Sequence, residues 1–438
     1  MRRARSDEGQ EGAPGRHISR RALLAGAVGG VGVILLKGPI GLPLAWSGER
    51  PSGPQASDSL ITRVTRPYDA ETPVAALTSY LTPNHLFFVR SHFGPPPAED
   101  VAETTWRLRV GGLVERPIEL TLSQLRRMEP VTITAVVQCS GNGRAFHRPK
   151  VPGVQWERGA VGNAQWTGVR LRDLLAKAGL APQARHVQFQ GADRPVAASV
   201  PQFIRSIPIE KTMHPDTILA YEMNGERLPL LHGAPLRVVT PGWMADACVK
   251  WLTDITVRAD EAPGYYMQTA YRMPVNAVAP GESANGPTRP VEAMVVKSLI
   301  ALPREGETVK VGPVAIQGIA WGGEAKVEKV EVSTNEGHTW ESARLVGEHR
   351  PYAWRQWRFD WTAKSTGTFS ILCRATDAHG DVQPAASPWN PSGFLWNGWD
   401  RVTVTVSVRR DWLRRPRRCL SRSESDVKRE ALSVRRQA

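Results

Sequence analysis

The chain has 438 residues, of which 41% are hydrophobic and 22% charged, a composition typical of a soluble globular protein long enough for two domains. Its net charge of +14 lies mainly at the ends, because residues 409–438 carry eleven Lys/Arg against four Asp/Glu and residues 1–46 carry seven against three. Only +3 remains for residues 47–408, so the charge argues against a body that binds nucleic acid.

The N-terminal region is predicted to be an export signal of the twin-arginine type. Arg20 and Arg21 precede an apolar run, residues 22–36, that contains no charge. This run is shorter than the roughly twenty residues that span a bilayer, which favours a signal over an anchor. We expect a periplasmic protein that is exported folded, after its cofactor has been inserted. Two alternatives stay open: an uncleaved membrane anchor, since Pro43 is a poor partner for cleavage at Ala45, and a basic start followed by a core helix.

The first large region, residues 47–258, is predicted to be a mixed α and β domain with an extended lead-in over residues 47–80. The predicted strands are residues 84–92, 106–110, 118–120, 236–240 and 249–257. The predicted helices are residues 124–128, with Thr121-Leu-Ser123 as the cap, and residues 171–178, closed by Gly179. Asn224-Gly225 predicts a hairpin turn.

The most informative stretch is residues 134–144, in which an apolar strand runs into a polar loop with Cys139 at the junction. Gly141 and Gly143 provide the backbone freedom that a tight loop needs. Arg144 brings a positive charge that favours the thiolate, the form that attacks electrophiles or binds a soft metal. The alternative is a small buried cysteine without a reactive role.

The four cysteines do not form a recognisable metal or haem motif. They are Cys139, Cys248, Cys373 and Cys419. Because no C-x-x-C and no C-x-x-C-H occurs, the sequence predicts neither a zinc ribbon, an iron–sulfur set nor covalently attached haem. No pair stands out by its spacing as a disulfide.

The character of the chain changes after residue 258. Residues 259–290 are dense in Pro, Gly and Asn and predict a linker, while residues 409–438 are charged and predict a disordered tail. Between them, residues 291–408 show alternating strands without a helical pattern, typical of an antiparallel sandwich of immunoglobulin type. The predicted strands there are residues 314–321, 327–333, 354–361, 367–375 and 401–408.

Several motifs in a fixed order resemble the sulfite oxidase family of mononuclear molybdenum enzymes over residues 80–408. The motifs are Phe87-Phe-Val-Arg-Ser-His92, Gln138-Cys-Ser-Gly-Asn-Gly-Arg144, Gly153-Val-Gln-Trp156, Tyr221-Glu-Met-Asn-Gly225, His232-Gly-Ala-Pro-Leu-Arg237, Val249-Lys-Trp-Leu252 and Trp389-Asn-Pro-Ser-Gly393. The resemblance implies an α+β protein. In it, a mixed α/β molybdopterin-binding domain is followed by an immunoglobulin-like β-sandwich that mediates a homodimer.

The resemblance further implies a molybdenum–molybdopterin cofactor. The metal in this family takes one protein thiolate, and Cys139 stands at the matching position. The pterin carries a phosphate, which suits cationic partners. The residues implied to hold the cofactor are His92, His232, Arg237 and Lys250, with Asp193 at the pterin ring. Taken alone, each of these residue types is more often a surface or core side chain.

A pocket for an anionic sulfur substrate is also implied by the resemblance. Arg90 and Arg144 match the family's anion-binding arginines, and Trp156 matches the aromatic wall. Tyr271 matches a tyrosine beside the metal, and an interface aromatic is the alternative for it. Ser392 stands where the family's second domain supplies a third arginine, which makes a carrier-bound sulfur compound or another oxo-anion an alternative to sulfite.

These features predict a molybdenum-dependent oxidoreductase that transfers an oxygen atom to sulfite or a related sulfur compound. The chain shows no haem domain, so we expect electrons to pass to an external acceptor such as cytochrome c. Two other functions stay open. One is a reductase of a sulfoxide or nitrate that uses the same centre, and the other is an exported binding module in which Cys139 is simply buried.

Overall fold

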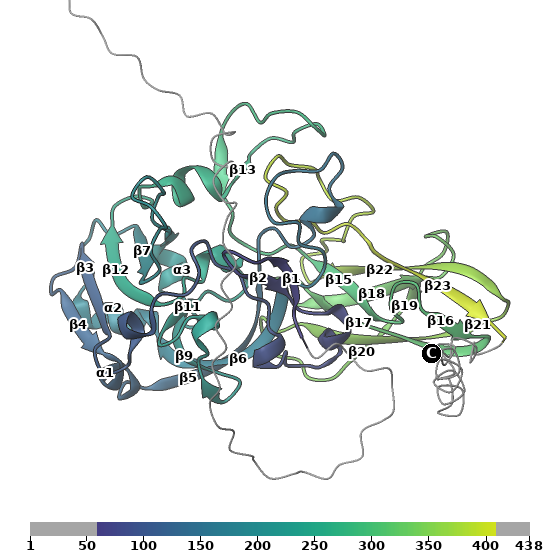
Figure 1. The fold of residues 1–438 in the computed structure, drawn as a ribbon, viewed down its shortest axis with the longest axis horizontal. Helices are drawn as coiled ribbons and strands as arrows, with labels where there is room; N and C mark the ends of the chain where they lie inside the picture. The colour runs from purple at the N-terminus through teal and green to yellow at the C-terminus, as the bar shows by residue number, and fades with distance from the viewer. Residues whose placement is uncertain (1–58, 409–438) are drawn as a thin grey trace, which may run out of the picture. The chain divides into compact units, whose positions relative to one another are not determined.

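The computed structural model describes residues 59–408, so the predictions made for residues 1–46 and 409–438 lie outside the described residues. Within residues 59–408 the chain forms two successive regions (Figure 1). The first combines a mixed sheet and an antiparallel sheet with short helices, and the second is built from strands. In this part of the chain no helix has both the length and the apolar character needed to cross a bilayer.

The first region contains two five-stranded sheets. One has the order β4-β3-β12-β7-β8, in which β12 runs parallel to β3 and antiparallel to β7. Its strands are β3 (Arg107–Gly112), β4 (Ile118–Thr121), β7 (His186–Gly191), β8 (Ile204–Pro208) and β12 (Leu252–Arg258). The other has the order β10-β9-β6-β5, with β11 paired to β9. Its strands are β5 (Pro130–Gln138), β6 (Val161–Arg170), β9 (Ile218–Met223), β10 (Glu226–Arg227) and β11 (Arg237–Val239).

Two of the short helices and one turn form close to where the local sequence predicts them, while α3 was not predicted. The α-helices are α1 (Leu122–Arg126), α2 (Leu171–Ala178) and α3 (Ile209–Thr212). The side chains and backbones of Thr121 and Gln124 form a capping box at the start of α1, and Gly179 ends α2 with a φ of 73°. Asn224 and Gly225, with φ of 54° and 77°, join β9 to β10 as the predicted hairpin.

The structure shows that the predicted strand over residues 84–92 is wrong. Asn84–Leu86 forms a 3-10 turn that begins after Pro83, and within the segment Val89 makes an isolated bridge to Ala70. Proline has a fixed φ and no N–H, so it favours the start of a turn over a strand ladder. The segment therefore forms no continuous strand, and the alternation of a strand does not place Arg90 and His92.

The lead-in and the linker contain more regular structure than their compositions predict. β1 (Ile61–Val64) pairs with β2 (Asp69–Glu71) in the lead-in. In the linker, a π-helical turn (Tyr266–Ala270) is followed by β13 (Arg272–Pro274), which pairs with β14 (Thr288–Pro290). The linker thus places Tyr271 between two ordered elements.

The second region is a sandwich of two sheets. One has the order β15-β17-β21-β20 and the other β16-β23-β22-β18-β19. The strands are β15 (Lys297–Leu302), β16 (Thr308–Lys310), β17 (Gly312–Trp321), β18 (Val327–Ser333), β19 (Glu341–Ser342), β20 (Arg344–Val346), β21 (Arg355–Ala363), β22 (Gly367–Asp377) and β23 (Asp400–Ser407). Ile300, Ile316 and Trp357 of one sheet share a buried core with Val330 and Ile371 of the other. The predicted sandwich is confirmed, although β16 and β23 pair in parallel.

The second region contacts the end of β5, where the Cys139 loop begins. Trp321 donates from Nε1 to Oε1 of Gln138 at 2.6 Å, and the backbone N–H of Leu395 donates to the carbonyl of Ser140 at 3.0 Å. The two residues that flank Cys139 are therefore each held by the sandwich.

Candidate functional site

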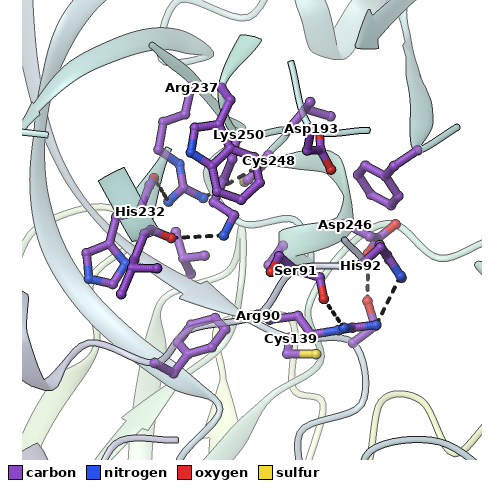
Figure 2. Close-up of a pocket in the computed structure, with 18 of the residues that line it drawn as sticks. Arg90, Ser91, His92, Cys139, Asp193, His232, Arg237, Asp246, Cys248 and Lys250 are labelled. Carbon is purple, nitrogen blue, oxygen red and sulfur yellow. Dashed lines mark hydrogen bonds between the residues drawn. The ribbon is translucent and has the colours of Figure 1, made fainter. Parts of the chain in front are cut away.

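A pocket lies beside Cys139 (Figure 2). Eight of the ten residues that the sequence predicts for the site line it: Arg90, His92, Cys139, Asp193, His232, Arg237, Lys250 and Tyr271. They come from segments separated by up to 181 positions between Arg90 and Tyr271, and the fold gathers them on one pocket.

The backbone around Cys139 forms a tight turn. Its N–H donates to the carbonyl of Ala160, and its own carbonyl accepts from the N–H of Asn142, both at 2.9 Å. Gly143 has a φ of 94°, and Trp396 occupies the space that a Cβ there would need. Only glycine meets both conditions, which explains why the loop carries it.

The Cys139 side chain is buried beside two cations. Burial raises the pKa of its thiol, while the positive charges of Arg90 and Arg144 act to lower it. A metal ion that binds such a thiol would take the place of its proton, which is released on binding.

A chain of polar contacts fixes Arg90 on one side of the pocket. Nη1 of Arg90 lies 3.0 Å from Oδ2 of the buried Asp69, and Nη2 lies 3.1 Å from Nδ1 of His92. The other ring nitrogen of His92 lies 3.0 Å from the hydroxyl of Tyr271. Burial and the nearby positive charges hold the pKa of His92 well below its usual value, so the ring is neutral near pH 7. Arg90 is thus a fixed cation with an oriented, neutral histidine beside it.

The opposite side of the pocket holds Arg237, His232 and Lys250 (Figure 2). Arg237 donates to the carbonyl of His232 at 2.8 Å, and Nζ of Lys250 donates to the carbonyl of Leu231 at 2.9 Å. Burial lowers the pKa of Lys250 to about 7 and raises the pKa of Asp193 to about 6. Both shifts show that these charges are held away from water.

This side of the pocket fits an anionic group such as a phosphate. Nε of Arg237 is buried without a hydrogen-bond partner, and an ammonium has two more N–H donors than Lys250 uses on Leu231. Buried donors normally have partners, so the unpaired nitrogen of Arg237 leaves a donor for an anionic ligand on this side of the pocket. With a soft sulfur at Cys139 and cations opposite, the donors present fit a phosphate-bearing metal cofactor.

Arg144 and Trp156 do not line this pocket. Trp156 is fully buried, and Arg144 packs behind the Cys139 loop. Arg144 donates from Nε to the carbonyl of Ser392 and from Nη1 to the carbonyl of Val154, both at 3.1 Å. Its guanidinium lies 5.3 Å from the ring centre of Phe394. The roles of Arg144 and Trp156 at a substrate stay predictions.

Sequence reasoning missed several residues of the site. Asp69 anchors Arg90 from the lead-in, and Phe203, Asp246 and Cys248 line the pocket. Asp69 stands in a stretch without a motif, and its partner lies 21 positions away. Cys248 lies two positions before Lys250, and this closeness is the one signal that pointed to it.

Two family models match the chain. The oxidoreductase molybdopterin binding domain matches residues 92–266, and the Mo-co oxidoreductase dimerisation domain matches residues 288–407.

Similar proteins share both regions. The mitochondrial sulfite oxidase of Homo sapiens is 37% identical over 378 residues, covering 81% of this chain and 68% of that protein. The sulfite oxidase of Arabidopsis thaliana is 35% identical, covering 83% of this chain and 97% of that protein. Among solved structures, the sulfane dehydrogenase SoxCD of Paracoccus pantotrophus aligns with a TM-score of 0.66 at 29% identity, covering 78% of this chain and 85% of that one.

Proposed function

Because the chain belongs to the sulfite oxidase family of molybdopterin-dependent oxidoreductases, we propose that it oxidises sulfite or a related anionic sulfur compound. The observation that carries the proposal is that one pocket brings together these residues. It sets the Cys139 thiol beside Arg90, with Arg237 and Lys250 on the opposite side. A metal-binding sulfur, a fixed cation for a substrate anion and cations for a cofactor phosphate are the three parts that this chemistry requires.

In this proposal the residues of the chain divide between cofactor and substrate. Cys139 would hold molybdenum through Sγ. The residues that would hold the pterin cofactor are His92, Asp193, His232, Arg237 and Lys250. When bound, the cofactor supplies the centre that exchanges an oxygen atom and accepts two electrons. Arg90, kept in place by Asp69, attracts and orients the anion, and Tyr271 closes the pocket next to it.

The overall reaction proposed for sulfite takes one oxygen atom from water. Sulfite and water give sulfate, two protons and two electrons. The chain must therefore bring an anion to a site that already holds sulfur ligands of negative charge, and Arg90 with Arg144 supplies the positive field for this. Because Arg144 is turned toward the carbonyls of Ser392 and Val154, this field is weaker than three free guanidinium groups would give. A sulfur compound of lower charge is therefore included in the substrate class.

The proposal extends to the partners and the address of the protein. Residues 288–407 match a dimerisation domain, which supports a homodimer. The paired arginines at positions 20 and 21 support export to the periplasm by the twin-arginine route. An external one-electron acceptor, cytochrome c, would take the electrons one at a time.

The test uses the purified full-length protein. Metal analysis is expected to find about one molybdenum per chain, a stoichiometry that follows from one thiolate site. Sulfite is expected to support the reduction of cytochrome c. A protein that contains molybdenum yet oxidises no sulfur compound, and instead consumes reduced dye with nitrate or a sulfoxide, would be a reductase. A protein without molybdenum after expression in a host that makes the cofactor would be a binding module.

A further inference from the structure

A buried ion pair adjoins the cofactor pocket and is not used by any residue assigned to the cofactor. Nη2 of Arg205 lies 2.7 Å from Oδ2 of Asp246, and both side chains are at most 2% exposed. Asp246 lines the pocket together with Cys139 (Figure 2). Removing two charges from water is costly, so a buried pair contributes little net stability and is better explained by what it positions.

The pair reaches the metal-ligand loop through Ser140. The second carboxylate oxygen of Asp246 accepts a hydrogen bond from Oγ of Ser140 at 2.6 Å, and Ser140 directly follows Cys139. The carbonyl of Ser140 accepts from the N–H of Leu395 in the sandwich. Ser140 is therefore held by two contacts. Its carbonyl is bound by the sandwich, and its hydroxyl is bound by Asp246 of the first region.

The other end of the pair reaches the linker. Nη1 of Arg205 donates to the carbonyl of Tyr266 at 2.7 Å, and its guanidinium lies 5.3 Å from the ring centre of Tyr271. Arg205 comes from β8 and Asp246 from a 3-10 turn (Ala245–Ala247). The cluster thus connects a strand, a turn, the linker and the loop that follows Cys139.

We propose that Arg205 and Asp246 are positioning residues that orient Cys139 through Ser140 and balance the charge beside the metal. Asp246 places its carboxylate on the pocket wall, and the guanidinium of Arg205 pairs with it. A negative charge near a metal favours its oxidised form, and a positive charge favours its reduced form. The two charges of the pair cancel, so the pair adds no net charge beside the metal site while it holds the loop. The inference rests on the cofactor being bound, and it does not depend on which substrate is oxidised.

Two substitutions separate charge from geometry. Asp246→Asn keeps an oxygen that accepts from Ser140 but leaves Arg205 unbalanced, so the midpoint potential of the molybdenum is expected to rise. Ser140→Ala keeps both charges but frees the loop, so the Mo(V) electron paramagnetic resonance spectrum is expected to change with a smaller shift in potential. Both readouts use redox mediators, so they stand even where the proposed substrate fails.

Controls distinguish this role from a purely structural one. The pair formed by Arg109 and Asp254 has the same charges and the same 2.7 Å separation, but it lies at the surface. Asp254→Asn is expected to leave the potential unchanged. The double variant Arg205→Met/Asp246→Asn removes both charges and should return the potential toward the wild type, while Arg205→Lys should keep the potential and the spectrum close to the wild type.

The inference is overturned in either of two cases. One is a potential in Asp246→Asn that matches Asp254→Asn. The other is a double variant whose potential lies further from the wild type than that of Asp246→Asn. If Asp246→Asn, the double variant and Arg205→Lys all lose molybdenum, the pair serves folding alone and the inference also fails.

Discussion

Lys250 lines the pocket near another cation, Arg237, and this position makes the stability of the cofactor-free protein depend on pH. The side chain is partly buried in the pocket, and desolvation there, together with the positive charge of Arg237, lowers its pKa to about 7. In the unfolded chain the pKa of a lysine is about 10.5. Between these two pKa values the unfolded state binds more protons than the folded state. The free energy of unfolding therefore rises with pH over that range, and the gain is absent below it.

We therefore expect the cofactor-free protein to gain stability as pH rises from about 7 toward 10, by at most about 1.4 kcal/mol per pH unit from this one group. Lys250→Met should flatten that slope in urea unfolding of the cofactor-free protein. Lys364→Met, which changes an exposed lysine, serves as the matched control. An equal slope in Lys250→Met and in the wild type would show that Lys250 is not a buried, costly charge.

Cys139 is the residue on which the proposed metal site depends. We expect Cys139→Ser to stay folded and to lose activity by more than about 100-fold, since even the supports of a metal ligand typically contribute 10–100-fold. A hydroxyl is a much poorer ligand than a thiolate for a soft metal centre. Activity, molybdenum content and the thermal midpoint would be measured together.

Cys373→Ser provides the comparison for that experiment. Cys373 lies in the core of the sandwich and accepts a hydrogen bond from Oγ of Ser298, which a serine at 373 can also accept. It should keep its activity. Substantial turnover in a molybdenum-loaded Cys139→Ser protein would refute the ligand assignment.

At the scale of elements, the segment over residues 389–396 is where the family resemblance predicts a third substrate arginine, and here it packs on Arg144 and Tyr271. Ser392 offers its carbonyl to Arg144, and Phe394 stacks on Tyr271 with ring centres 5.5 Å apart. The contact to Arg144 comes from the backbone, so a new side chain at 392 leaves it intact.

We expect Ser392→Arg to lower the Michaelis constant for sulfite by about tenfold. This corresponds to about 1.4 kcal/mol, a typical size for a hydrogen bond to a charged group. The turnover number should change little, because the new contact binds the anion without taking part in the oxygen transfer. Ser392→Met adds a similar bulk without charge and should not lower the Michaelis constant. An equal effect of both changes would assign the gain to packing.

The elements also show which parts of the molecule a sequence can predict. The helix cap within residues 121–123, the turn at Asn224 and Gly225 and the strand before Cys139 depend on neighbours within a few residues, and all three form as predicted. The segment after Pro83 was misjudged because its apolar run resembles a strand. Asp69 and Asp246 could not be predicted, since each meets its cation only after distant segments have packed together.

The whole chain separates its charge by region. The terminal stretches hold +4 and +7, from seven Lys/Arg against three Asp/Glu in residues 1–46 and eleven against four in residues 409–438, and the body holds +3. A nearly neutral body agrees with a pocket in which Asp69 and Asp246 balance arginines one by one. The excess positive charge is thus a property of the ends, and at the N-terminal end it includes the pair that we expect to direct export.

We expect Arg20→Lys together with Arg21→Lys to abolish export while leaving a folded, molybdenum-loaded protein in the cytoplasm. The double change keeps the positive charge but removes the planar guanidinium donors, and an export receptor reads the latter. Cell fractionation with metal analysis of each fraction is the measurement. Arg2→Lys with Arg3→Lys is the matched control, because it changes another arginine pair of the same region that does not adjoin the apolar run and should not affect export. If the protein with Lys at 20 and 21 still reaches the periplasm with its molybdenum, the route does not read these arginines, and residues 22–36 act as a signal of another kind or as an anchor.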